Sequence, residues 1–193
     1  MGRRALRYAG ASRPIPGETA NGDQWLVNER PDGLRVAIVD GLGHGSEAEA
    51  AALAAIDVLR SAPDLAPVDA LLRCDQALRG TRGAAASVLT IDPAHGVLLF
   101  AGVGNVEGRL RSDGHERHFS PNRGVLGQGV RRPHVLEFAL VGAWTVLLHS
   151  DGIRTRDFPD MDTSRSVDEL ARDMIANHSR DTDDASVVIV RGE

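Results

Sequence analysis

The order of its short apolar segments constrains the fold of this chain more than any other feature of its sequence. Apolar runs at residues 24–29 and 34–39 flank a Pro-Asp-Gly turn. Runs at residues 86–91 and 97–103 flank a second turn segment, Asp-Pro-Ala-His-Gly. Two apolar runs around such turn residues are typical of β-hairpins. The remaining strand-like runs cover residues 106–111, 135–140, 144–149 and 187–190.

Between the second and third of these runs, the spacing of apolar residues changes to that of helices. Ser46 is predicted to be the N-cap of a first helix, because Glu49 follows three residues later in the pattern of a capping box. Leu53, Ile56 and Leu59 then recur at helical spacing, which predicts one apolar helix face.

Two further helices complete the predicted elements. One begins at Pro67 and carries Cys74 on its apolar face, and the other covers residues 166–178. The resulting order, β-β-α-α-β-β-β-β-β-α-β, lacks the regular alternation of strand and helix that builds a parallel sheet. It predicts an α+β fold of antiparallel sheets with helices packed outside, in a single domain over residues 1–193.

Composition excludes several classes of protein. All 22 basic residues are arginine, so a Schiff-base lysine and the lysine of a nucleotide-binding P-loop are ruled out. The single cysteine, Cys74, excludes an intrachain disulfide. A net charge of −5 argues against a nucleic-acid partner. Because the chain has no long apolar run and no signal-peptide pattern, we expect a cytoplasmic protein without a membrane partner.

Aspartates at the ends of the apolar runs are the candidate functional residues. A carboxylate at a strand end is held rigidly and points away from the core. Several carboxylates that converge there raise one another's pKa unless a cation neutralises them. Carboxylate clusters suit magnesium or manganese, with water completing the coordination. The aspartates in such positions are Asp23, Asp40, Asp151, Asp183 and Asp184.

Two other interpretations compete for these residues. Asp-Gly pairs are ordinary turn sequences, and we expect Asp32 and Asp113 to lie in such turns. The glycines of residues 41–45 could instead cradle a phosphate at a helix start. A dinucleotide-binding fingerprint, however, requires a glycine where this chain has Ser46 and an acid at the end of a second strand. Nucleotide binding is therefore disfavoured.

The residues around Asp40 decide between these interpretations. Residues 36–48 read VAIVDGLGHGSEA and resemble the second acidic motif of the SpoIIE-type branch of metal-dependent serine/threonine phosphatases, the PPM family. Three further motifs occur in the family's order and extend the resemblance over nearly the whole chain. They are Gly22-Asp23, Ser150-Asp151-Gly152 and Asp183-Asp184-Ala185-Ser186. Residues 73–77, 82–87 and 102–106 are similar to the short stand-alone members that act in stressosome signalling.

The resemblance implies a four-layer αββα sandwich and a site for two ions, either Mn²⁺ or Mg²⁺. It implies that Asp40 bridges both ions and that the main-chain carbonyl of Gly41 binds one of them. Asp151 and Asp183 would hold the other ion, and these two residues and Asp40 would be catalytic. Asp23 would act through a bound water. The implied metal-binding set is Asp23, Asp40, Gly41, Asp151, Asp183 and, as the neighbouring alternative to Asp183, Asp184.

The proton donor for the leaving group is less well defined by the motifs. Eukaryotic relatives have a histidine directly after the Asp-Gly pair, where this chain has Leu42, and His44 follows two residues later. His44 is therefore a candidate proton donor or, alternatively, a residue that hydrogen-bonds its own loop. Arg13 is a candidate for the phosphate-binding arginine of those relatives or, alternatively, a surface residue.

The predicted activity is metal-dependent hydrolysis of phosphoserine or phosphothreonine in proteins, with a metal-activated water attacking phosphorus. The resemblance implies phosphorylated STAS-type scaffold or anti-sigma-antagonist proteins as substrates in bacterial stress signalling, and we expect a monomer. Two alternatives remain. One is a pseudophosphatase that binds partners without catalysis, and the other is an enzyme acting on a small phosphoester.

Overall fold

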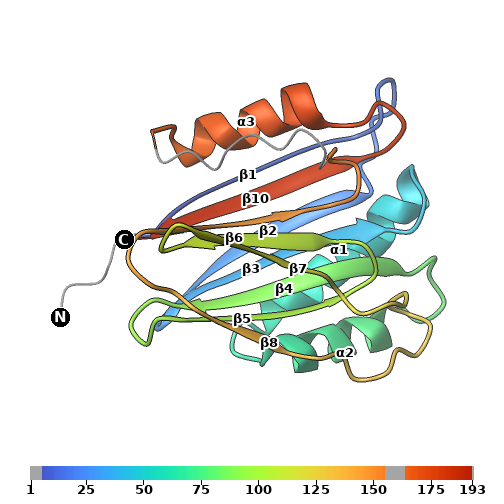
Figure 1. Ribbon diagram of the computed structural model, residues 1–193. Coiled ribbons are helices and arrows are strands. Elements are labelled where there is room, and N and C mark those ends of the chain that lie inside the picture. The colour runs from blue at the N-terminus through green and yellow to red at the C-terminus, as the bar shows by residue number, and fades with distance from the viewer. Residues whose placement is uncertain (1–5, 155–163, 193) are drawn as a thin grey trace.

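The computed structural model describes residues 6–154 and 164–192, and its centre is a pair of antiparallel sheets packed face to face (Figure 1). The first sheet has the strand order β1-β10-β9-β6-β7. Its strands are β1 (Arg7–Arg13), β10 (Ala185–Gly192), β9 (Trp144–His149), β6 (Glu107–Ser112) and β7 (His115–Phe119). The second has the order β2-β3-β4-β5-β8. Its strands are β2 (Asp23–Arg30), β3 (Gly33–Gly41), β4 (Ala84–Asp92), β5 (Val97–Val103) and β8 (Leu136–Ala139).

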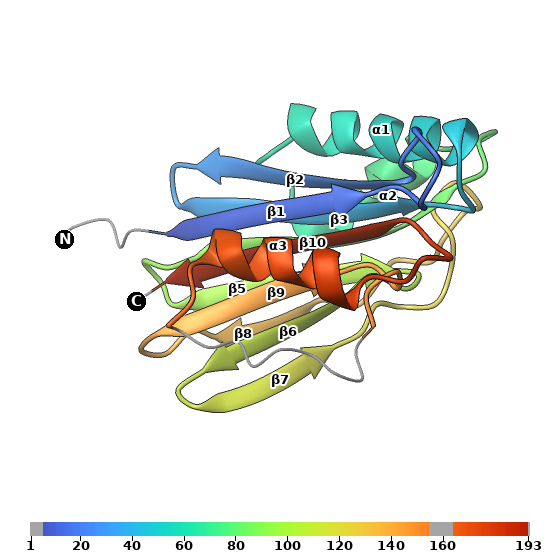
Figure 2. The same ribbon diagram turned by 90° about the horizontal axis from the view of Figure 1, so that it is seen from above.

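Helices cover the outer face of each sheet. Helix α3 (Val167–His178) packs on β1 and β10 of the first sheet, and α1 (Ser46–Ser61) packs on β2 and β3 of the second. Beside it, α2 (Pro67–Ala77) covers β4 and β5, so the layers run α3, sheet, sheet, α1 with α2 (Figures 1 and 2). This arrangement confirms the predicted αββα sandwich. Among the described helices, none combines the length and the apolar character needed to cross a membrane.

The central strands are buried on both faces, because each sheet lies between a helix layer and the other sheet. Strands β9 and β10 therefore read as continuous apolar runs, although they belong to antiparallel pairs. Helix α1 approaches its sheet closely because its buried face consists largely of alanine. That face comprises Ala48, Ala51, Ala52, Ala55, Ile56 and Leu59.

Two strands of the first sheet were not predicted from the sequence. Both lie at the edges of that sheet, where β1 pairs only with β10 and β7 pairs only with β6. The sequence of β7, HERHF, is exposed except at its last residue, and β1 contains mostly small or charged residues. Edge strands with an exposed face lack the apolar run that marks a central strand, so neither strand was recognisable.

The start of α1 also differs from the prediction. Its N-cap is Gly45, no side chain caps the helix, and the predicted capping box of Ser46 and Glu49 is absent. Glu49 Oε1 instead accepts a hydrogen bond from the main-chain N–H of Asn21, at 3.0 Å. Leu53, predicted on the apolar face, is 45% exposed. The capping box of this chain is at α3, between Ser166 and Glu169.

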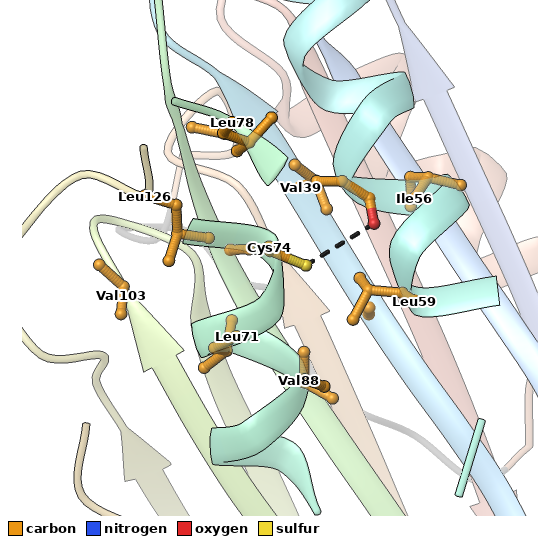
Figure 3. Packing of buried hydrophobic residues seen from close by; sticks show 14 of the residues in the cluster. Val39, Ile56, Leu59, Leu71, Cys74, Leu78, Val88, Val103 and Leu126 are labelled. Carbon is orange, nitrogen blue, oxygen red and sulfur yellow. Dashed lines mark hydrogen bonds between the residues drawn. The ribbon is translucent and has the colours of Figure 1, made fainter. Parts of the chain in front are cut away.

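Cys74 lies in the apolar cluster between α2 and the second sheet, as Figure 3 shows. Its Sγ donates to the main-chain carbonyl of Ala55 at 3.7 Å, and burial raises the pKa of the thiol to about 12. Because the reactive species is the thiolate, we expect native protein at pH 8 to resist thiol-specific reagents. Labelling of unfolded protein provides the control, and one equivalent of fast labelling in native protein would contradict the prediction.

Candidate active site

An open pocket of about 350 Å³ lies where strands from both sheets end. Asp40 enters it from the end of β3, whereas Asp151 follows β9 and Asp183 precedes β10. The connections β3–α1, β5–β6 and β7–β8 form its walls. The lining residues are Asp40, Leu42, Gly43, Ala85, Gly104, Asn105, Gly124, Val125, Asp151 and Asp183. The structure thus brings together the three aspartates that the motifs implied to be catalytic.

Asp23 lies beside Asp40 on the neighbouring strand β2, outside the pocket lining. It is directly opposite Asp40 in the β2–β3 pair and is 1% exposed. Its Oδ2 accepts a hydrogen bond from the hydroxyl of Ser150, the residue before Asp151. Ser150 Oγ also accepts from the main-chain N–H of Ser186, at 3.0 Å. The serine hydroxyl therefore connects the buried carboxylate of the second sheet to two strands of the first.

Burial and mutual repulsion strongly perturb these carboxylates. Burial is the main cause that raises the pKa of Asp40 to about 8, and the charges of Asp23 and Asp151 add to it. Burial likewise raises the pKa of Asp23 to about 7, although the hydrogen bond from Ser150 opposes the increase. The pKa of Asp183 is also raised, first by burial and then by the charge of Asp151. A bound cation would reverse these shifts by stabilising the charged forms.

Asn105 is a site residue to which the sequence assigned no role. Its Nδ2 donates to Asp151 Oδ2 at 2.8 Å, and its hydrogen bond to Asp40 opposes the rise in that residue's pKa. The amide therefore contacts both carboxylates, and it stabilises the ionised form of Asp40. A signal for it existed, since Asn105 directly follows Gly104 in one of the segments similar to the phosphatase family, beyond the end of β5.

Asp184 has a different position from the one proposed for a metal ligand. It is 3% exposed and is not part of the pocket lining, which includes Asp183. Its Oδ1 accepts from the main-chain N–H of Ile15 at 2.8 Å, and its Oδ2 accepts from that of Gly22 at 2.7 Å. Both oxygens thus hold the segment leading into Asp23, and we do not retain Asp184 among the proposed ligands.

This arrangement predicts a structural effect of Asp184→Asn. An asparagine has one acceptor oxygen, so its NH₂ group would face one of the two N–H donors. We expect a loss of about 1–3 kcal/mol in the free energy of unfolding, measured by urea denaturation. Asp181→Asn, at an exposed position three residues earlier, is the matched control. Equal stability of the Asp184 variant and the wild type would contradict the role of its carboxylate.

The glycines of the two Asp-Gly motifs lie where the chain packs too closely for a side chain, and Gly152 also lies in a turn closed by the Ile153 N–H, which donates to the Ser150 oxygen at 3.2 Å. A Cβ on Gly41 would lie 2.0 Å from the main-chain oxygen of Ala48, at the start of α1. A Cβ on Gly152 would lie 1.8 Å from the main-chain oxygen of Asp184. Asp113 and Gly114, in contrast, both have positive φ, at 51° and 72°, between β6 and β7. The predicted hairpin turn there is confirmed.

His44 and Arg13 both lie outside the pocket lining. His44 Nδ1 is 2.7 Å from Glu18 Oε1, and its side chain is 62% exposed. Arg13 donates to Ser179 Oγ at 2.8 Å and to the main-chain oxygens of Pro14 and Arg180. The Arg13 guanidinium therefore fastens β1 to the segment after α3. Nothing in this arrangement supports phosphate binding by Arg13, and we do not propose it.

The donor set fits a hard divalent cation. Magnesium and manganese favour carboxylate, carbonyl and water oxygens, and Asp40, Asp151 and Asp183 present carboxylates to one pocket. Within residues 6–154 and 164–192, no group of three or more His, Cys, Asp or Glu side chains is arranged to hold a metal ion. Coordination would therefore have to include water and main-chain oxygens such as that of Gly41, as is usual for magnesium.

Solved structures share this architecture. A chain from a bacterial stressosome system, described as adapted to control secondary-messenger signalling, is 30% identical, with a TM-score of 0.92 over 97% of this chain and 100% of its own. RsbX in complex with magnesium is 22% identical, with a TM-score of 0.90, and the match covers 100% of this chain and 98% of the RsbX chain. The catalytic domain of the phosphatase PstP with two manganese ions is 19% identical, with a TM-score of 0.76, and the match covers 97% of this chain and 98% of the PstP domain. The fold is that of the PP2C-type phosphatases.

Sequence comparison defines the family within this class. The family model of stage II sporulation protein E (SpoIIE) matches residues 30–192. This chain belongs to the SpoIIE family. It is 25% identical over 175 residues, 90% of its length, to the phosphoserine phosphatase RsbX of Bacillus subtilis (strain 168), and the match covers 88% of RsbX. RsbX is the stand-alone phosphatase that the sequence motifs indicated, so that resemblance is confirmed.

Proposed function

We propose that this chain removes phosphate from serine or threonine residues of phosphorylated STAS-type scaffold or anti-sigma-antagonist proteins in bacterial stress signalling. It would act in the cytoplasm as a monomer, and residues 1–193 would form one phosphatase domain. The substrate proposal follows from the similarity to RsbX and to a stressosome chain. The chain is a serine/threonine phosphatase by its SpoIIE family membership and its relation to a phosphoserine phosphatase.

One observation carries the proposed site. Asp40, Asp151 and Asp183 come from distant parts of the chain and line one pocket, with Asp23 buried opposite Asp40 on the neighbouring strand. Bringing several carboxylates close together is unfavourable unless a cation offsets their charge. We propose that the pocket binds Mn²⁺ or Mg²⁺, with two ions expected from the family motifs.

The proposed ligands are Asp40, the main-chain carbonyl of Gly41, Asp151 and Asp183, with Asp23 acting through water. Bound divalent cations supply charge stabilisation for phosphoryl oxygens and lower the pKa of water, so that hydroxide forms near neutral pH. Asn105 orients the Asp151 carboxylate through its 2.8 Å hydrogen bond. Ser150 donates a hydrogen bond to Asp23, which lies opposite Asp40 in the β2–β3 pair.

The proton for the leaving serine oxygen requires a donor near the pocket. His44 remains the proposed donor, although its ring is now paired with Glu18. To donate, the ring would have to turn from Glu18 toward the pocket, and its 62% exposure leaves room for that rotation. A His44→Gln variant with an unchanged pH–rate profile would assign the proton to water instead.

Hydrolysis assays test the proposed function. We expect manganese-dependent release of phosphate from a phosphorylated STAS protein, and no release after addition of a chelator. A rate on free phosphoserine that equals or exceeds the rate on the protein would favour a small-molecule phosphatase. Absence of turnover, together with absence of tight manganese binding by calorimetry, would favour a pseudophosphatase.

A further inference from the structure

A guanidinium lies at the mouth of the pocket, on the connection between α2 and β4. Arg82 Nη1 is 3.1 Å from the position that a Cβ would take on Gly43, and Gly43 lines the pocket. In the described part of the chain, the charged residues of the lining are all aspartates. Arg82 thus places positive charge beside an otherwise acidic opening.

The backbone around Arg82 is held against both walls of the pocket. The main-chain N–H of Leu42 donates to the oxygen of Gly83 at 3.0 Å, which joins this connection to the β3–α1 wall. A Cβ on Gly83 would lie 2.5 Å from the main-chain oxygen of Leu126, in the β7–β8 wall. Thr81 Oγ1 accepts from the N–H of Gly83 at 3.0 Å and tightens the turn. The position of the Arg82 backbone is therefore well defined.

The present partner of Arg82 is exchangeable. Arg82 Nε lies 2.5 Å from Glu47 Oε2, and the two side chains are 48% and 70% exposed. Water screens an ion pair with this exposure, so the pair contributes little to stability. A dianionic phosphate or an ordered carboxylate would compete effectively for the planar guanidinium, which binds either group through two parallel hydrogen bonds.

We propose that Arg82 is a substrate-binding residue that receives an anionic group of the phosphoprotein at the pocket mouth, displacing Glu47. The inference rests on the proposed function, because the anion is either the phosphoryl group itself or a carboxylate beside it in the substrate. Leu42, which lines the pocket and is 44% exposed, offers apolar contact beside the same opening.

Phosphate binding and peptide kinetics test the assignment. Inorganic phosphate is titrated by calorimetry into the manganese-loaded wild type and the variants Arg82→Gln, Glu47→Gln and Arg79→Gln. The KM is then measured for two phosphoserine peptides, one with neutral and one with aspartate residues flanking the phosphoserine. Arg79→Gln is the matched control, because it removes the same charge from an exposed position of the same connection.

We expect Arg82→Gln to weaken phosphate binding and to raise both peptide KM values by about tenfold, with kcat nearly unchanged. An increase confined to the acidic peptide would assign the carboxylate as the anion instead. Glu47→Gln should strengthen binding of the same anion about two- to threefold, because it removes the competing carboxylate. Arg79→Gln should match the wild type.

The proposal would be overturned if Arg82→Gln kept the wild-type phosphate affinity and peptide KM values. It would also be overturned if Arg79→Gln weakened phosphate binding as much as Arg82→Gln does. Unchanged anion binding in Glu47→Gln would overturn the displacement of Glu47. If the wild type shows no turnover but Arg82→Gln still weakens phosphate binding, the proposed function fails and the assignment of Arg82 stands.

Discussion

Replacing Asp40 with asparagine is expected to lower the metal-dependent hydrolysis rate by at least about 10³-fold, because it removes several kcal/mol of cation-based transition-state stabilisation. Asp40 is the residue on which the other acids converge, since Asp23, Asp151 and Asp183 all contribute to its raised pKa. The neutral amide keeps the side-chain shape but loses the charge that attracts a cation. Rates on an aryl phosphate and on a phosphoprotein, measured over a range of manganese concentrations, provide the test.

The same substitution should stabilise the protein without metal. Asp40→Asn removes a carboxylate whose charged form is disfavoured by burial and by the charges of Asp23 and Asp151, so the melting temperature of chelator-treated protein should increase. Asp113→Asn makes the same chemical change in an exposed turn, where asparagine also tolerates positive φ. This control should change neither the hydrolysis rate nor the melting temperature of the metal-free protein. Retention of full activity by Asp40→Asn would refute the proposed metal site.

The second large effect concerns the pH dependence of stability. Burial raises the folded-state pKa of Asp23 to about 7 and of Asp40 to about 8, whereas the unfolded chain has ordinary values. Between about pH 4 and pH 8 the unfolded state therefore releases protons that the folded state retains. Rising pH then favours unfolding, and stability is lost up to the folded-state pKa values. Metal-free protein should melt roughly 5–10 °C lower at pH 8 than at pH 5.5.

Manganese should reverse this trend, because it binds the deprotonated carboxylates and is displaced by protons. Thermal melts at half-unit pH steps, with chelator and with manganese, measure both curves. The stabilisation by manganese should grow with pH, and Asp40→Asn should flatten both curves. A melting temperature that rises with pH in the chelator-treated wild type would show that these carboxylates are not buried together.

Most of the fold could be predicted from local patterns. The hairpin of β2 and β3 was recognisable because a Pro-Asp-Gly turn separates two apolar runs, and the same holds for β4 and β5. Strands β1 and β7 were missed because their stability comes from pairing with a neighbour rather than from an apolar run. The start of α1 was misassigned because Glu49 bonds Asn21, which lies outside the helix.

The site was predictable only as a set of residue types. Asp40 and Asp151 could be singled out because each follows a strand and precedes a glycine within a family motif. Ser150 and Asn105 also lie in family-like segments, but their roles could not be assigned, because these depend on carboxylates that only folding brings near them. Arg82 could not be placed at the pocket mouth from its sequence neighbours, since Gly43 lies on a different connection.

By itself, the sequence determined the order of the three helices and of all strands except β1 and β7, and the antiparallel character of the sheets. These depend on turn chemistry and on apolar spacing, which are local. It also identified the acidic motifs, through their resemblance to a family. Only the tertiary structure decided which neighbouring acid faces the pocket. Asp183 lines it, whereas Asp184 turns inward to the N–H groups of Ile15 and Gly22. Adjacent carboxylates have the same intrinsic chemistry, so only their surroundings distinguish them. The N–H donors that bind Asp184 come from the other end of the chain, and folding alone brings them there.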